Sequence, residues 1–174
     1  MIIALGHSAR AGKDTAAQAL VDTLGFTRVA FADPLRALVL AIDPIVAQAV
    51  GALGWEEAKT RLPFVRDRLI EVGNAARYAL GADVWVTLSR PALREHKRVV
   101  VTDVRYPNEL LALKALGALT IKIERPGFPP RDDPSDRALA NWSDWDLVIT
   151  NDGTIEDLRD HITAWVGMYL RTTA

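Results

Sequence analysis

Short apolar runs alternate with stretches of helical periodicity along the chain. Because a strand, a helix and a second strand join as a right-handed crossover, this alternation predicts a parallel sheet with helices on both faces. The clearest strand is Arg-Val-Val-Val-Thr at 98–102, whose consecutive β-branched residues suit a strand buried on both sides. The predicted strands cover residues 2–5, 27–31, 98–102, 119–124 and 147–150.

Helical patterns fill the intervals between these strands. Gly25, Gly81 and Gly117 each follow such a pattern, and glycine is the usual residue after the last turn of a helix. The predicted helices cover residues 13–24, 34–41, 65–80, 84–95, 108–116 and 154–170, with helical pieces at 42–60 broken by Pro44, Gly51 and Gly54. The expected fold class is therefore α/β: three layers, with a five-stranded parallel sheet, in a single domain of residues 1–174.

Composition and charge narrow the range of partners. The 174 residues suit one compact domain, and a net charge of −1 gives no general attraction to nucleic acid or to an anionic membrane. The chain has no cysteine, which excludes disulfides, thiolate metal sites and cysteine nucleophiles. No apolar run approaches the roughly 20 residues of a membrane-spanning helix, and residues 1–5 are too few for a signal peptide. We expect a cytoplasmic protein without nucleic-acid or membrane partners.

Residues 6–15 read Gly-His-Ser-Ala-Arg-Ala-Gly-Lys-Asp-Thr and stand between the first strand and the first helix. This context predicts a phosphate-binding loop, since backbone N–H groups and a helix N-terminus can surround phosphate oxygens while a lysine adds positive charge. His7 occupies the place of the usual first glycine, and Asp14 that of the usual hydroxyl residue. The alternative is a plain helix N-terminus with a chance Gly-Lys pair. The predicted ATP-binding residues are Ala11, Gly12, Lys13, Asp14 and Thr15.

Two residues of this loop carry open alternatives. Asp14 either holds magnesium through water or only caps the helix, and the neighbouring Thr15 is the other candidate magnesium partner. Arg10 either stabilises the charge of the transferring phosphoryl group or faces solvent.

Asp103 ends the most hydrophobic strand. A carboxylate there is costly unless it binds something, and in phosphate-loop enzymes an acid at this place holds magnesium, usually through water. We therefore predict a magnesium site that includes Asp103. Arg105, two residues later, either pairs with Asp103 or reaches a phosphate.

The acceptor is expected to contact a helical region at about 33–95. Asp33 reads as the N-cap of a helix, with Pro34 in the first helical position, and with Arg36 it is placed to meet an acceptor phosphate or sugar. Arg66 and Arg77 are eleven residues apart and so share a helix face, although helical arginines are usually solvated.

The segment 125–142 follows a strand directly and is rich in proline and glycine near its start. It reads either as a solvated loop or as a short lid that excludes water during transfer. Its three arginines are the predicted lid residues: Arg125, Arg131 and Arg137.

These stretches together resemble the deoxynucleoside monophosphate kinases of bacteriophages, a branch of the phosphate-loop nucleoside monophosphate kinase superfamily, over nearly the whole chain. The resemblance rests on the phosphate loop and on several short runs. These are Phe-Ala-Asp-Pro-Leu at 31–35, Gly-Ala-Asp-Val-Trp at 81–85, Thr-Asp-Val-Arg-Tyr-Pro-Asn-Glu at 102–109, Glu-Arg-Pro-Gly at 124–127 and Asn-Asp-Gly-Thr at 151–154.

The resemblance implies transfer of the γ-phosphate of ATP to a deoxynucleoside monophosphate, with Mg²⁺, in the host cytoplasm if the chain is phage-encoded. It adds Asp83 and Trp85 to the acceptor-facing residues and supports Arg77. The chain departs from the family where Asp-Pro-Ser-Asp at 133–136 replaces the usual His-Pro-Ser-Glu, and where Ala75 stands in place of an acid. Base preference is left open, and so is the choice between monomer and homodimer. The alternatives are a kinase for another small phosphorylated metabolite or sugar acid, and a nucleotide-binding module without turnover.

Overall fold

The computed structural model describes residues 1–6, 9–128 and 134–172. The chain divides into two compact units, of which unit 1 comprises residues 1–30 and 91–174 and unit 2 comprises residues 31–90. Unit 1 contains every strand of the sheet, whereas unit 2 is helical.

The sheet of unit 1 has five strands in the order β2-β3-β1-β4-β5, and all neighbours are parallel. β1 is therefore the central strand, with β3 on one side and β4 on the other. This arrangement confirms the expected five-stranded parallel sheet. The strands are β1 (Ile2–Gly6), β2 (Thr27–Val29), β3 (Val99–Val104), β4 (Leu119–Glu124) and β5 (Leu147–Thr150).

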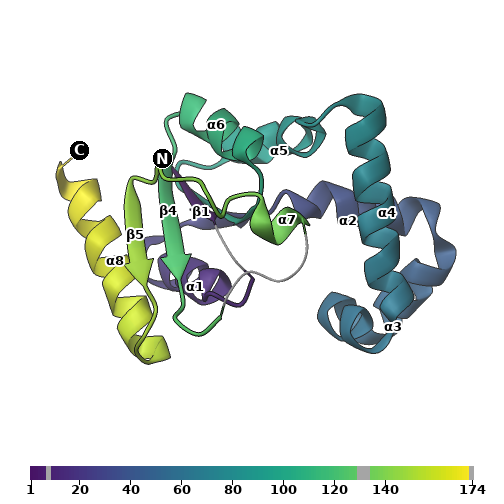
Figure 1. The fold of residues 1–174 in the computed structure, drawn as a ribbon, viewed down its shortest axis with the longest axis horizontal. Coiled ribbons are helices and arrows are strands. Elements are labelled where there is room, and N and C mark those ends of the chain that lie inside the picture. Colours follow the sequence, from purple (N-terminus) through teal and green to yellow (C-terminus); the bar gives the residue numbers. More distant parts are fainter. Residues whose placement is uncertain (7–8, 129–133, 173–174) are drawn as a thin grey trace. The chain divides into compact units, whose positions relative to one another are not determined.

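Helices cover both faces of this sheet (Figure 1). On one face α1 and α8 pack against each other, and their apolar residues share a core with Ile3 and Ile121 of the strands. On the other face α6 contacts β1 and β4 and buries Leu110 and Leu113, which lie outside that core. The helices of unit 1 are α1 (Lys13–Leu24), α6 (Pro107–Ala115), α7 (Pro134–Arg137) and α8 (Ile155–Thr172), and α5 (Val84–Glu95) crosses from unit 2 into unit 1.

The composition of α1 explains how close it lies to the sheet. Ala16, Ala17 and Ala19 are buried, and alanine combines the highest helix propensity with the smallest side chain. Gly25, at φ 68°, ends the helix in the left-handed conformation, as the sequence predicts. The helix that carries the phosphate loop is thus held firmly against the central strands.

Unit 2 has its own small core. Val39, Val46, Ala58 and Val65 are fully buried and come from three different helices. Asp43 caps the helix that begins at Pro44, because its carboxylate accepts hydrogen bonds from the backbone N–H groups of Ile45 and Val46 at 3.1 and 3.0 Å. The helices are α2 (Ala32–Ile42), α3 (Pro44–Arg61) and α4 (Pro63–Leu80).

The start of α2 corrects one prediction. The helix begins at Ala32 and its N-cap is Phe31, so Asp33 lies in the first turn and Pro34 is the third helical residue. Asp33 is therefore not the N-cap residue, and its side chain pairs with Arg36 at 3.5 Å. The helix extends toward its N-terminus because alanine continues it at no conformational cost.

The structure of unit 2 confirms the breaks predicted at Pro44 and Gly54 and corrects the one predicted at Gly51. α3 is helical from Pro44 through Gly51, and within it only Gly54, at φ 75° and ψ 164°, departs from helical geometry.

Within the described residues no single helix is long and apolar enough to span a membrane. α2 and α3, which are bent by 119° at their junction, meet that criterion only when they are taken together.

Candidate active site

The phosphate loop joins the central strand β1 to α1. Gly12 is the N-cap of α1 and has φ 107°, a conformation that residues with a side chain rarely adopt. A Cβ atom on Gly12 would also lie 2.7 Å from Asn151 Nδ2 and 2.8 Å from a methyl carbon of Leu158. Glycine is therefore required at this position both by the backbone and by its neighbours.

Asn151 braces the loop from the far edge of the sheet. It follows β5 directly, and its Nδ2 donates a hydrogen bond of 2.9 Å to the carbonyl oxygen of Ala11. Sequence reasoning did not assign Asn151 to the site. A signal was available, because side chains that directly follow parallel strands meet at one edge of the sheet.

Gly6, at the end of β1, is explained by packing. A Cβ atom there would lie 2.8 Å from Cζ3 of Trp145, and closer still to the outermost carbon of that ring. The indole thus packs directly on the last residue of the central strand. This contact gives a structural reason for a glycine one position before the place of the usual first glycine; His7, which occupies that place, lies outside the described residues.

Lys13 is the electrostatic centre of the loop. Burial, and next the nearby Arg105 guanidinium, lower the pKa of Lys13 from 10.5 to about 8. The carboxylates of Asp136, Asp14 and Asp103 act in the opposite direction. The structure therefore brings together Lys13, Asp14, Asp103 and Arg105, which the sequence analysis had proposed as site residues, and adds Asp136, which it did not single out.

Asp103 reaches this cluster through the register of the sheet. Gly6 of β1 pairs with Val104 of β3, so Asp103 lies level with the start of the phosphate loop. The chain after Asp103 is fixed by Glu109, which is 2% exposed and accepts hydrogen bonds from the backbone N–H groups of Arg105 and Tyr106 at 2.8 and 3.1 Å. Glu109 thereby completes a capping box at the start of α6.

Two arginines meet at one aromatic ring. The guanidinium carbon of Arg125 lies 4.3 Å from the ring centroid of Phe128, and that of Arg10 lies 5.7 Å from the same centroid. Arg10 has φ 63° and is the one residue other than glycine with a positive φ among those described. The phosphate loop and the start of the predicted lid are thus joined through Phe128.

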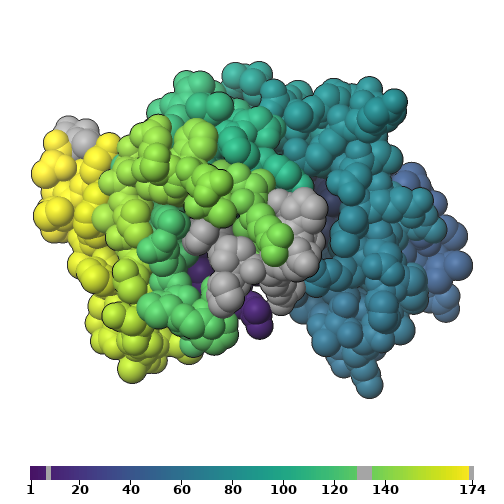
Figure 2. All heavy atoms as spheres, in the orientation of Figure 1, coloured from purple at the N-terminus to yellow at the C-terminus, as the bar shows by residue number. Residues whose placement is uncertain are grey.

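The second part of the predicted lid region, from Pro134 on, contacts the phosphate loop and the end of β3. Asp136 Oδ1 accepts a hydrogen bond of 2.9 Å from the backbone N–H of Ala9, and Ser135 Oγ accepts one of 3.1 Å from Arg105 Nη1. Arg125 and Arg137 are exposed, and Arg131 lies outside the described residues. Figure 2 shows the green segment that contains α7 at the surface of unit 1, and Figure 1 shows β4 and β5 between α7 and α8.

The oxygen donors beside Lys13 fit a magnesium ion that arrives with a nucleotide. Magnesium typically takes one or two carboxylates and fills its remaining positions with water and substrate phosphates. Asp14 and Asp103 both act on the Lys13 ammonium, and Thr15 lies on the first turn of α1. The described residues contain no group of three or more acidic or histidine side chains able to hold a metal ion by themselves.

The predicted acceptor residues all lie in unit 2 except Arg105. Arg36 pairs with Asp33 at 3.5 Å, and its guanidinium carbon lies 5.7 Å from the ring centroid of Trp55. Arg77 Nη1 donates a hydrogen bond of 2.9 Å to the carbonyl oxygen of Ala82 just beyond α4.

The remaining members of that set differ in exposure. Arg66 and Asp83 are exposed, whereas Trp85 is 4% exposed in the first turn of α5. A buried indole suits a packing role at least as well as a contact with an acceptor. The role of this set at the acceptor stays a prediction.

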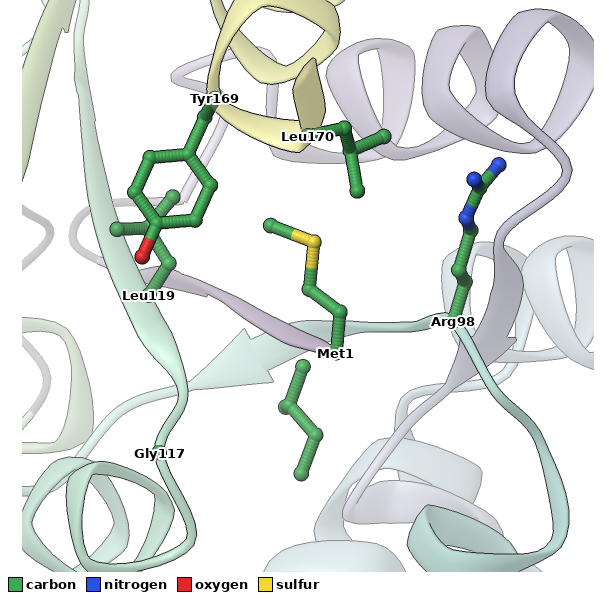
Figure 3. A pocket seen from close by; sticks show the side chains of 7 residues that line it. Met1, Arg98, Gly117, Leu119, Tyr169 and Leu170 are labelled. Atoms are coloured by element: carbon green, nitrogen blue, oxygen red, sulfur yellow. The ribbon is translucent and has the colours of Figure 1, made fainter. Parts of the chain in front are cut away.

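A separate hollow of about 370 Å³ opens at the end of the sheet where the strands begin (Figure 3). It lies at the starts of β1 and β4, where Met1, Leu119, Tyr169 and Leu170 line it together with Arg98. The phosphate loop follows the other end of β1. This hollow is therefore not the place where phosphates would bind.

Comparison with known proteins supports the kinase interpretation. The family model described as deoxynucleotide monophosphate kinase matches residues 79–162. A protein of Acanthamoeba polyphaga mimivirus, named provisionally as a deoxynucleotide monophosphate kinase, is 30% identical over 187 residues, which cover 95% of this chain and 96% of that protein. The deoxynucleotide monophosphate kinase of Enterobacteria phage T4 is 42% identical over 59 residues, 34% of this chain and 24% of the phage protein.

The fold has relatives among solved structures. Shikimate kinase from Aquifex aeolicus superposes with a TM-score of 0.51 at 15% identity, over 96% of each chain. At this identity the likeness shows a shared phosphate-loop kinase fold. The extent of the mimivirus match carries the further conclusion: the chain is a kinase and belongs to the deoxynucleotide monophosphate kinase family.

Proposed function

We propose that the chain transfers the γ-phosphoryl group of ATP to a deoxynucleoside monophosphate, giving ADP and the deoxynucleoside diphosphate. The observation that carries the proposal is the convergence at Lys13. A glycine-dependent loop, a helix N-terminus and charged side chains from three segments meet at the carboxyl end of the central strands. Such an arrangement is suited to binding the phosphates of a nucleotide.

The reaction needs little covalent chemistry from the protein. An oxygen of the acceptor phosphate attacks the γ-phosphorus in line, the bond from that phosphorus to the β–γ bridging oxygen breaks, and ADP leaves with the electron pair. The acceptor phosphate is already an anion, so no general base is required. The contribution of the protein is positioning and stabilisation of charge.

Each donor-side residue has a specific task in this proposal. Lys13 and the backbone N–H groups of Ala11 to Thr15 bind the donor phosphates, and Arg10 and Arg125 neutralise charge on the transferring group. Asp103, with Asp14 or Thr15, would hold magnesium. When bound, the ion would neutralise negative charge on the phosphate oxygens of ATP. Arg137 and Arg131 are assigned to the lid.

The acceptor side rests on unit 2. The residues of unit 2 proposed to face the acceptor are Asp33, Arg36, Arg66, Arg77, Asp83 and Trp85. Arg105 of unit 1 is proposed separately as an acceptor residue. A guanidinium can bind two oxygens of a phosphate at once, so Arg36 and Arg77 are the residues best suited to the acceptor phosphate. We further propose that the protein acts in the cytoplasm, where ATP is abundant.

The test is a panel of acceptors. ADP formation from Mg-ATP is measured with dAMP, dGMP, dCMP, dTMP and their ribose counterparts, in the wild-type chain and in Lys13→Ala. We expect turnover with at least one deoxynucleotide and a fall of about two orders of magnitude or more in Lys13→Ala, because the loop loses its mobile charge. ATP binding without turnover on any acceptor would contradict the proposed reaction, and equal turnover in Lys13→Ala would contradict the site.

A further inference from the structure

Asp136 is a buried carboxylate in a segment that would be expected to be solvated. It lies in α7, a helix of only four residues, yet it is 6% exposed. Burial of a charged carboxylate is costly unless hydrogen bonds and opposite charges compensate for it. Both are present: Oδ1 accepts the hydrogen bond from Ala9 N–H at 2.9 Å, and the carboxylate acts electrostatically on Lys13.

We propose that Asp136 is a positioning residue of the donor site, whose carboxylate holds the phosphate loop at Ala9 in the conformation that receives ATP. A hydrogen bond to an ionised acceptor is about twice as strong as one between neutral groups. This one joins residues 127 positions apart in the sequence. It therefore restrains the loop at Ala9 from outside the loop itself.

Two neighbouring contacts keep Asp136 in place. Ser135 Oγ accepts a hydrogen bond from Arg105, and Leu139, which is 1% exposed, lies against Gly6 at the other side of the same segment. α7 is thus attached both to the end of β3 and to the end of β1. The carboxylate consequently has a fixed position from which to orient the loop, as a positioning residue must.

The role of Asp136 differs from that of the arginines. It accepts a hydrogen bond from a backbone N–H of the loop, and as an anion it would repel a phosphate rather than bind one. Asp136 would therefore act on the donor through Ala9 and Lys13. Loss of the carboxylate should weaken ATP binding by releasing the loop, while the folded structure elsewhere is retained.

The experiment compares three variants. Asp136→Asn keeps an oxygen acceptor for Ala9 but removes the charge, and Asp136→Ala removes both. Asp144→Asn is the matched control, because Asp144 lies in the same segment but is 75% exposed and pairs with Lys114 at 2.8 Å instead of with the loop. Each protein is titrated with Mg-ATP by calorimetry, well below its melting temperature.

We expect the Kd for ATP to rise about tenfold in Asp136→Ala, to rise less in Asp136→Asn and to stay unchanged in Asp144→Asn. Equal ATP affinity in the wild type and both Asp136 variants would overturn the proposal, even if their melting temperatures fall. If Asp136→Ala does not fold, the isosteric Asp136→Asn decides by the same criterion.

A second measurement needs no nucleotide. Amide hydrogen exchange at Ala9 in the ligand-free protein should accelerate in Asp136→Ala and not in Asp144→Asn, because only the former loses the acceptor. Unchanged exchange at Ala9 would overturn the proposal. The role of Asp136 rests on the proposed function for its ligand, ATP, but different results contradict the two proposals. A wild-type chain that binds ATP and phosphorylates no deoxynucleotide contradicts only the proposed reaction.

Discussion

Replacement of Gly12 by alanine is the sharpest test of the loop geometry. The backbone at φ 107° is left-handed, and an L-residue there costs about 1–2 kcal/mol. The added methyl group would also displace Asn151 Nδ2, which lies 2.7 Å from its position, and break the hydrogen bond to Ala11. A lost hydrogen bond contributes about 1 kcal/mol more, so we expect Gly12→Ala to destabilise the protein by about 2–3 kcal/mol.

Two variants separate these contributions. Gly25→Ala places an alanine at φ 68° with no atom within 4 Å of the new Cβ, so it measures the cost of backbone conformation alone, about 1 kcal/mol. Asn151→Ala removes the hydrogen bond to Ala11 without straining the backbone. The sum of these two losses of stability should approach that of Gly12→Ala, although the sites of Asn151 and Gly12 are coupled because they touch.

The assay is urea denaturation followed by circular dichroism, with the slope m checked for each variant so that a change in midpoint reports stability. ADP formation is measured at a temperature where all variants are folded. Gly12→Ala should lose most of its activity, whereas Gly25→Ala should keep it. A Gly12→Ala variant no less stable than Gly25→Ala would refute the reasoning, since strain and displacement at the loop would then cost nothing.

Substitutions at three further positions test neighbouring groups. Arg10→Gly should be about 1 kcal/mol more stable than Arg10→Ala, because glycine tolerates φ 63°, while both lose turnover equally; urea midpoints and ADP release check this. Phe128→Leu should lower kcat and Phe128→Trp should largely retain it, because only an aromatic ring attracts the Arg10 and Arg125 guanidinium groups. Steady-state kinetics measure this, and an equal loss of kcat in both variants would contradict a role for the aromatic ring. Lys13→Met should be more stable than the wild type at pH 7, because the pKa of Lys13 is lower in the folded than in the unfolded state, so protonation of Lys13 opposes folding. The difference in stability should shrink as the pH rises from about 8 to 10.5, where Lys13 loses its proton. A difference that does not depend on pH would refute this.

The sequence predicts the framework of this site because the framework depends on local patterns. The β-branched run of β3, the glycine after α1 and the strand–loop–helix context of Lys13 are each readable within a few residues. The position of Asp103 at a strand end follows from the same pattern. The start of α2 was mistaken because Asp33 and Pro34 form a common helix-start pair, whereas the observed helix begins at Ala32, which continues a helix without conformational cost.

The residues that brace the loop depend on long-range order, and of the three only Asn151, which directly follows a strand, has a signal in the sequence. Asp136, Asn151 and Trp145 contact the loop from sequence positions more than a hundred residues away. Each residue alone reads as a solvated acid, a turn residue or an aromatic near a loop. Their roles arise only when the strand order β3-β1-β4-β5 brings their segments to the central strand.

The charges around Lys13 lead to a last prediction, about magnesium. Of the charged groups that act on Lys13, three are carboxylates and one is a guanidinium, so a free triphosphate would meet carboxylates that repel it. Divalent cations neutralise such a site, and ATP should therefore bind more weakly in EDTA than with Mg²⁺. Asp103→Asn removes one carboxylate, so it should strengthen the binding of metal-free ATP and weaken that of Mg-ATP. Calorimetric titration of the wild type and Asp103→Asn, with and without metal, measures both. These opposite signs distinguish a metal-holding carboxylate from one that only pairs with a neighbouring cation, whose loss would change the two affinities in the same direction.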